Sequence, residues 1–83
     1  MTEIPPHLRW ACRRGMLELD VLLKNFLEES YPALTLAEQQ LFTKLLACSD
    51  QDLFEWFMRK KQPDDPQILT MVELILTHAR TRH

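Results

Sequence analysis

The sequence contains a single glycine among its 83 residues and few β-branched aliphatic residues. Hairpins and bulges use glycine repeatedly because their turns need positive φ angles, so this composition argues against a turn-rich β-protein. The apolar residues include 15 Leu and 4 Met but only 2 Val and 3 Ile. Side chains without β-branching lose little rotamer freedom in a helix. The composition therefore predicts an all-α fold.

Long apolar runs and an excess of basic residues are also missing. No apolar run approaches the roughly 18 residues needed to cross a bilayer, and residues 1–6 lack the basic and apolar regions of a secretory signal. We therefore expect no membrane association and a cytoplasmic location, or a mature chain whose presequence has been removed. The net charge of −2 lacks the basic character typical of nucleic-acid binding, although Arg9, Arg13 and Arg14 form a local basic patch.

Cysteine is scarce as well. Cys12 and Cys48 stand far apart with no CxxC spacing, so in a reducing compartment they are interpreted as small apolar residues of the core. Arg13 and Arg14 follow Cys12 and favour a lower pKa of its thiol. However, a helical protein of this size has little room for a substrate pocket, and the sequence places no general base. We therefore expect no catalytic residue.

Histidine offers no metal site by spacing. The histidines, cysteines and acidic residues of the sequence do not form an HxxxH, CxxC or ExxH pattern. We therefore interpret the histidines as isolated surface residues and not as metal ligands. A glycine-rich phosphate loop is excluded because it needs more than one glycine. The histidines are His7, His78 and His83. The sequence therefore predicts no bound metal and no nucleotide-binding motif.

Prolines, the glycine and capping residues divide the chain into helical segments of one domain, residues 1–83. The predicted helices cover residues 6–14, 16–30, 35–48, 50–59 and 66–80. Their connections are short, which predicts a compact antiparallel five-helix bundle.

Several boundaries have a specific signal. Gly15 is predicted at the C′ position of the first helix, where a left-handed conformation is common. Thr35 and Glu38 match a capping box, and Asp65 is a natural N-cap. The last helix is expected to direct these residues inward: Ile68, Met71, Val72, Ile75, Leu76 and Ala79.

The segment from Arg13 to Asp20 places the only glycine among four charges between the first two helices. Asp20 falls at the edge of an apolar stripe, where a carboxylate needs a partner from this fold or from another protein. Leu17 and Val21 lie on the far side of the same helix, so either another helix covers them or they form exposed apolar surface. Two interpretations remain open: a purely structural corner, or an edge that binds a partner.

This segment resembles a known family. The sequence Arg14-Gly15-Met16-x-Glu18-x-Asp20 matches the complete RGMxExD signature of the succinate dehydrogenase assembly factors that promote flavinylation. The likeness covers essentially the whole chain. It continues in Trp10-Ala11-Cys12-Arg13 before the signature and in Leu53-Phe54-x-Trp56, followed by a Pro-Asp break and a last helix.

The resemblance implies a function in protein assembly. Such factors are not enzymes; they bind the flavoprotein subunit of succinate dehydrogenase, and in bacteria also that of fumarate reductase, and they help FAD become covalently attached to a histidine of that subunit. The factor itself is then expected to hold no stable cofactor, to bind FAD weakly at most, and to be a monomer when free. Members were once also described as antitoxins, so a small regulator that binds a toxin or DNA is the alternative.

The resemblance also implies roles for individual residues. Arg14 would donate to carboxylates or carbonyls of the partner, so Arg14→Ala is expected to weaken the complex and leave the melting temperature almost unchanged. Gly15 would permit close approach of the two backbones. The full set of expected partner-binding residues is Trp10, Arg13, Arg14, Gly15, Met16, Glu18 and Asp20.

Within that set the roles differ. Met16 is expected to anchor the segment to the core. Glu18 and Asp20 are expected to be polar contacts or to organise the Arg14 side chain. For Trp10, a place in the core and a place at the interface are equally compatible with the sequence.

Overall fold

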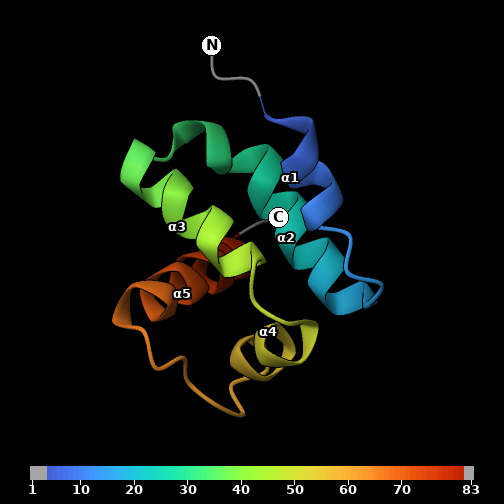
Figure 1. Ribbon diagram of the computed structural model, residues 1–83, viewed down its shortest axis with the longest axis vertical. Helices are drawn as coiled ribbons and strands as arrows, with labels where there is room; N and C mark the ends of the chain where they lie inside the picture. Colours follow the sequence, from blue (N-terminus) through green and yellow to red (C-terminus); the bar gives the residue numbers. More distant parts are fainter. Residues whose placement is uncertain (1–3, 82–83) are drawn as a thin grey trace.

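The structure is a computed structural model that describes residues 4–81 (Figure 1). Over this span it contains helices and no strand, which confirms the all-α prediction. The elements are α1 (Pro6–Ala11), α2 (Leu17–Glu29), the 3-10 helix η1 (Tyr31–Ala33), α3 (Leu36–Leu46), α4 (Asp50–Phe57) and α5 (Pro66–Thr81).

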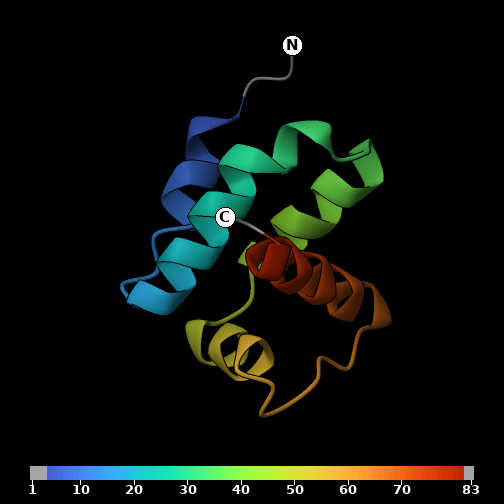
Figure 2. The ribbon, with the colours of Figure 1, turned by 180° about the vertical axis from the view of Figure 1, so that it is seen from behind.

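The helices are arranged around α5. This helix packs against α2, α3 and α4, and α1 lies beside α2 on the outside of the molecule (Figures 1 and 2). The radius of gyration of 11.8 Å matches the roughly 12 Å expected for a compact chain of this length. None of the helices within residues 4–81 is both long and apolar enough to cross a membrane. The antiparallel bundle order stays a prediction.

A continuous apolar core joins the elements. Phe42 of α3 lies at its centre, with ring centroids 5.5 Å from Phe26 of α2 and 5.7 Å from Tyr31 of η1. Burial of one such side chain contributes about 1.5–3 kcal/mol. The inward face predicted for α5 is correct for Ile68, Met71, Val72 and Ile75, whereas Leu76 is only half-buried and Ala79 is exposed.

The predicted capping signals are present. Thr35 Oγ1 accepts from the Glu38 backbone N–H at 3.2 Å, and Glu38 Oε1 accepts from the Thr35 backbone N–H at 2.9 Å, which completes the capping box. Asp65 Oδ1 accepts from the Gln67 N–H at 2.9 Å. Its other oxygen lies 2.7 Å from Lys44 Nζ, and this hydrogen bond lowers the pKa of Asp65.

Three helices end two or more residues earlier than predicted. Helix α1 stops at Ala11 instead of residue 14, so Gly15 is not its C′ residue but lies three positions beyond the C-cap, Cys12. Helices α3 and α4 stop at Leu46 and Phe57 instead of residues 48 and 59. The reason at α1 and α3 is tertiary, because residues after both ends are held by one arginine side chain.

The end of α4 uses an arginine where glycine is usual. Arg59 has a φ of 59°, and the N–H groups of Arg59 and Lys60 donate to the carbonyls of Trp56 and Glu55, the pattern of a Schellman cap. Both guanidinium nitrogens of Arg59 contact the Glu73 carboxylate at 2.9 and 3.1 Å. This pairing between α4 and α5 raises the pKa of Arg59.

Candidate functional site

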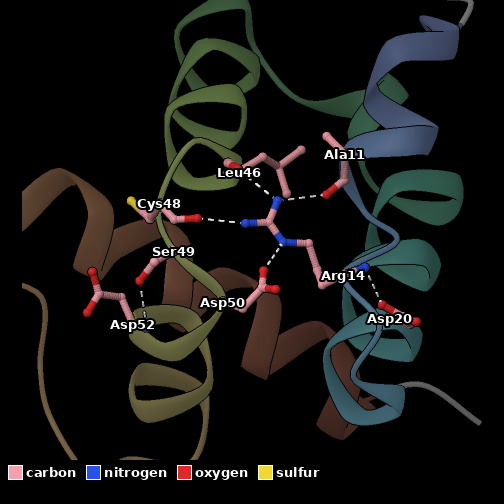
Figure 3. Close-up of polar contacts among 8 residues, drawn as sticks. All are labelled: Ala11, Arg14, Asp20, Leu46, Cys48, Ser49, Asp50 and Asp52. Atoms are coloured by element: carbon pink, nitrogen blue, oxygen red, sulfur yellow. Dashed lines mark hydrogen bonds and ion pairs between the residues drawn. The ribbon is translucent and has the colours of Figure 1, made fainter.

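One arginine side chain joins three helix ends (Figure 3). The Arg14 guanidinium donates from Nη1 to the carbonyls of Ala11 and Leu46, both at 2.9 Å, and from Nη2 to the carbonyl of Cys48 at 2.6 Å. Its Nε donates to Asp50 Oδ1 at 2.6 Å. Only 14% of the Arg14 side chain is exposed. This set of contacts, the Arg14 cluster, engages four of the five guanidinium donors.

The position of the cluster follows from helix electrostatics. Ala11 and Leu46 are the last residues of α1 and α3, and the final carbonyls of a helix have no partner within it. A cation is favourable at such an end, because the helix dipole is negative there. Asp50 is the first residue of α4, where the dipole favours an acid. The guanidinium therefore satisfies two C-termini and one acidic N-terminus together.

The backbone of Arg14 is held as firmly as its side chain. Its N–H donates to Asp20 Oδ1 at 2.6 Å, from the first turn of α2. Asp20 thus finds within this chain the partner that its place at the apolar edge requires. These contacts fix the segment between α1 and α2, residues 12–16, which forms the α1–α2 corner.

Gly15 lies at the turning point of the α1–α2 corner. Its φ of +81° falls in the left-handed region, where residues with a Cβ are strained. Apart from its two neighbours in the chain, a Cβ built there would meet no atom of residues 4–81 within 4 Å. The glycine is therefore required by its backbone conformation and not by packing inside this molecule, and the space in front of it is open.

Apolar side chains beside the corner face solvent. Trp10 is 72% exposed, Leu17 75% and Val21 48%. Leu17 and Val21 therefore form exposed apolar surface, since no helix within residues 4–81 covers them. For Trp10 it rules out a place in the core. The Arg13 guanidinium lies over the Trp10 ring, 5.7 Å from the ring centroid.

The structure divides the seven predicted site residues into two groups. Arg14 and Asp20 are directed inward into the chain's own contacts, and Met16 packs against the core as expected. The other four are exposed: Trp10, Arg13, Gly15 and Glu18. Four of the five guanidinium donors of Arg14 are occupied within the chain, so at most one is available to a partner.

Sequence reasoning missed the acceptors of Arg14. Asp50 was assigned only to the start of a helix, and the carbonyls of Leu46 and Cys48 carry no side-chain signal at all. The three positions lie more than 30 residues from Arg14 in the chain. Nothing in the local pattern of either segment indicates that they meet.

Cys12 lies in the core, as predicted, and the neighbouring arginines do not give its thiol a low pKa. Cys12 is buried, and burial raises the pKa of its thiol to about 11, with Arg14 lowering it by a smaller amount. Burial also raises the pKa of Cys48, which is half-buried and not fully in the core. Both cysteines are free thiols. Neither has the low pKa of a nucleophilic cysteine.

We predict that iodoacetamide alkylates Cys48 before Cys12 in the native protein, because the thiolate reacts and Cys12 is both covered and protonated. An ordinary thiol has a pKa of about 8.5, so its alkylation rate levels off between pH 9 and 10. The raised pKa of Cys48 makes its rate continue to rise across that interval. Peptide mass spectrometry over pH 7–10 measures both rates. Equal labelling of the two cysteines at pH 8 would contradict the prediction.

Metal chemistry has no support in the described part of the chain. Within residues 4–81 no three His, Cys, Asp or Glu side chains gather closely enough to hold an ion, and His83 lies outside that span. His78 is instead used structurally: its Nε2 lies 3.0 Å from Glu29 Oε1, and its ring meets the edge of Phe26 at 5.5 Å.

The fold and the corner together define a small helical protein with a rigid, solvent-facing edge built around one arginine and one glycine. The family model described as flavinator of succinate dehydrogenase matches residues 6–79. The chain belongs to this family.

Curated relatives agree with the family match. The chain is similar to a protein of Pseudomonas putida, with 47% identity over 90% of this chain and 89% of that protein. It is 54% identical to one of Pseudomonas aeruginosa over 83% of this chain and 82% of the relative. A protein of Aliivibrio fischeri is 49% identical over 92% and 88% of the two chains. All three are named FAD assembly factor SdhE.

Proposed function

We propose that this protein binds the flavoprotein subunit of succinate dehydrogenase, and that of fumarate reductase where present, and promotes covalent attachment of FAD to it. The observation that carries the proposal is the α1–α2 corner, which presents an open glycine and lies next to an exposed acid, Glu18, of the family's signature. The match to the family of succinate dehydrogenase flavinators supports the choice of partner.

The exposed groups of the corner and of the adjoining ends of α1 and α2 are the proposed contacts. Gly15 has open space before it, Glu18 and Arg13 are exposed, and Trp10 supplies an aromatic surface of the kind enriched at interfaces. Arg14 and Asp20 act indirectly, because their hydrogen bonds fix the conformation of the corner before the partner binds. A preformed surface loses less conformational entropy on binding than a flexible one.

The proposed mechanism is orientation. The protein acts as a chaperone and not as an enzyme: it stabilises the conformation of the flavoprotein in which FAD and the accepting histidine are aligned. Alignment of two reacting groups is worth several kcal/mol in a barrier. The protein works as a monomer in the cytoplasm, and the FAD on which it acts belongs to its partner.

The proposal is tested by isolating the flavoprotein from cells with and without this protein and comparing its in-gel flavin fluorescence. We expect strong fluorescence only when the protein is present, and we expect tagged protein to retain the flavoprotein on a column. Equal fluorescence in both preparations, with no flavoprotein retained, would refute the proposed function.

Glu18→Gln should reduce retention and flavin fluorescence while the stability stays within about 0.3–1 kcal/mol, the weight of one acid at a helix N-terminus. The reason is that Glu18 is exposed and makes no hydrogen bond or ion pair within residues 4–81. Asp52→Asn is the matched control, since Asp52 is an exposed acid in the first turn of α4, away from the corner. Thermal unfolding and the fluorescence assay measure both variants. Identical losses of fluorescence in the two would contradict a contact through Glu18.

A further inference from the structure

A cleft opens between α1 and α2 beside the corner, although the sequence predicts little room for a pocket. Its volume is about 460 Å³, and the buried side chains of Cys12 and Leu27 form part of its wall. Five charged residues surround it: Arg9, Arg13, Asp20, Lys24 and Glu28. The balance of positive and negative charge in this cleft indicates which kind of ligand it can bind.

The cleft carries more positive than negative charge. Asp20 already accepts a hydrogen bond from the corner backbone. Arg9 Nη1 lies 3.3 Å from Glu28 Oε2 in an exposed pair, and such pairs are weak and exchange partners readily. Among the described residues, neither Arg13 nor Lys24 pairs with a carboxylate. Two cations therefore face the cleft without an acidic partner.

We propose that this cleft binds an acidic side chain, Asp or Glu, of the flavoprotein partner; the proposal rests on the proposed function. Three cations against two carboxylates leave an excess of one positive charge, which matches one carboxylate. A phosphate monoester or a pyrophosphate brings more negative charge than this excess, and it would be repelled by the two resident carboxylates. Arg13 also lies over Trp10, so the cleft is continuous with the exposed edge of the corner.

Lys24→Glu should weaken binding of the purified flavoprotein about tenfold or more, because it replaces an attraction by a like-charge contact at the interface. Lys60→Glu is the matched control: it makes the same change of charge at an exposed lysine after α4. Lys24→Gln, which adds no charge repulsion with Asp20 or Glu28, should lie between wild type and Lys24→Glu. The affinities are measured by titration calorimetry at 50 and 300 mM salt, with circular dichroism of each variant.

The salt dependence gives a second readout. Wild-type affinity should fall as salt rises, since exposed charge pairs are screened, and the fall should be smaller for Lys24→Gln. Equal affinity of Lys24→Gln, Lys24→Glu and Lys60→Glu would overturn the cleft proposal alone, because the wild type still binds. If the wild type does not bind the flavoprotein, both the proposed function and the cleft assignment are wrong.

A phosphate ligand is distinguished directly. Inorganic pyrophosphate is titrated into the wild-type protein while the backbone amide signals of Arg13 and Lys24 are followed by NMR. We expect no saturable shift. A saturable shift that Lys24→Gln removes would show that the cleft is a phosphate site, and would overturn the carboxylate assignment.

Discussion

Arg14→Ala is expected to lower the free energy of unfolding by about 2–4 kcal/mol, the range for losing several hydrogen bonds to a charged group at a partly buried site. The alanine leaves the carbonyls of Ala11, Leu46 and Cys48 without their donor. It also frees the connection between α3 and α4 from the corner. This reverses the expectation from the sequence, in which the same variant leaves the melting temperature almost unchanged.

The comparison with Arg13→Ala isolates the effect of the Arg14 cluster. Arg13 is the neighbouring arginine, but it is exposed, and the one contact described for its side chain is the Trp10 ring. Its truncation should therefore change stability by no more than about 0.5–1 kcal/mol. Arg14→Lys should fall between, because an ammonium group keeps the charge but not the planar fork. Urea unfolding followed by circular dichroism gives all three values. If Arg14→Ala is as stable as Arg13→Ala, the cluster does not stabilise the fold.

The cluster also links Asp50 to the corner. Asp50 stands outside the family signature. Its carboxylate and the Cys48 carbonyl nevertheless accept the two shortest hydrogen bonds of the Arg14 side chain, each at 2.6 Å. Loss of the Arg14 side chain should therefore reduce flavinylation through a loosened corner, and not through a missing contact with the partner. Amide hydrogen exchange at residues 12–16 should rise in Arg14→Ala, which a simple interface role for Arg14 does not predict.

Local signals in the sequence were sufficient to locate the helices, although not all of their ends. The capping box at Thr35 and the cap at Asp65 are both present, and the apolar spacing identified most of the core, because these features depend on residues within one or two turns. The ends of α1 and α4 were missed for tertiary reasons. The Arg14 side chain binds the carbonyl of Ala11 at the end of α1. Arg59, which pairs with Glu73, adopts a left-handed conformation that the sequence pattern assigns to glycine.

The candidate site was predictable in its location but not in its internal roles. The signature indicated the corner, and the place of Asp20 at the edge of an apolar stripe indicated that its carboxylate needs a partner. The structure identifies Asp20 as the structural acid, because its carboxylate accepts a hydrogen bond from the Arg14 backbone N–H. The same holds for Leu17, Val21 and Trp10, since exposure depends on where the other helices pack, and no pattern within α1 or α2 determines that.

Gly15→Arg is expected to abolish retention of the flavoprotein and to reduce its flavin fluorescence to the level of cells that lack this protein. The variant should still fold. Apart from its two neighbours in the chain, a Cβ at residue 15 meets no atom of residues 4–81 within 4 Å. The loss of stability is therefore limited to about 1–2 kcal/mol from placing an L-residue at positive φ. The loss of function arises because a long charged side chain fills the space that the partner must occupy.

Gly15→Ala separates the two physical effects of this substitution. Alanine has the same unfavourable φ as arginine but adds only one methyl group. If bulk at the contact surface is decisive, Gly15→Ala loses as much stability as Gly15→Arg in thermal unfolding yet keeps most of the flavin fluorescence. If both variants lose fluorescence equally while circular dichroism shows both folded, the left-handed conformation itself is what the partner needs. An unfolded Gly15→Ala would show that the glycine serves the fold, and the corner would then lose its main support as a binding surface.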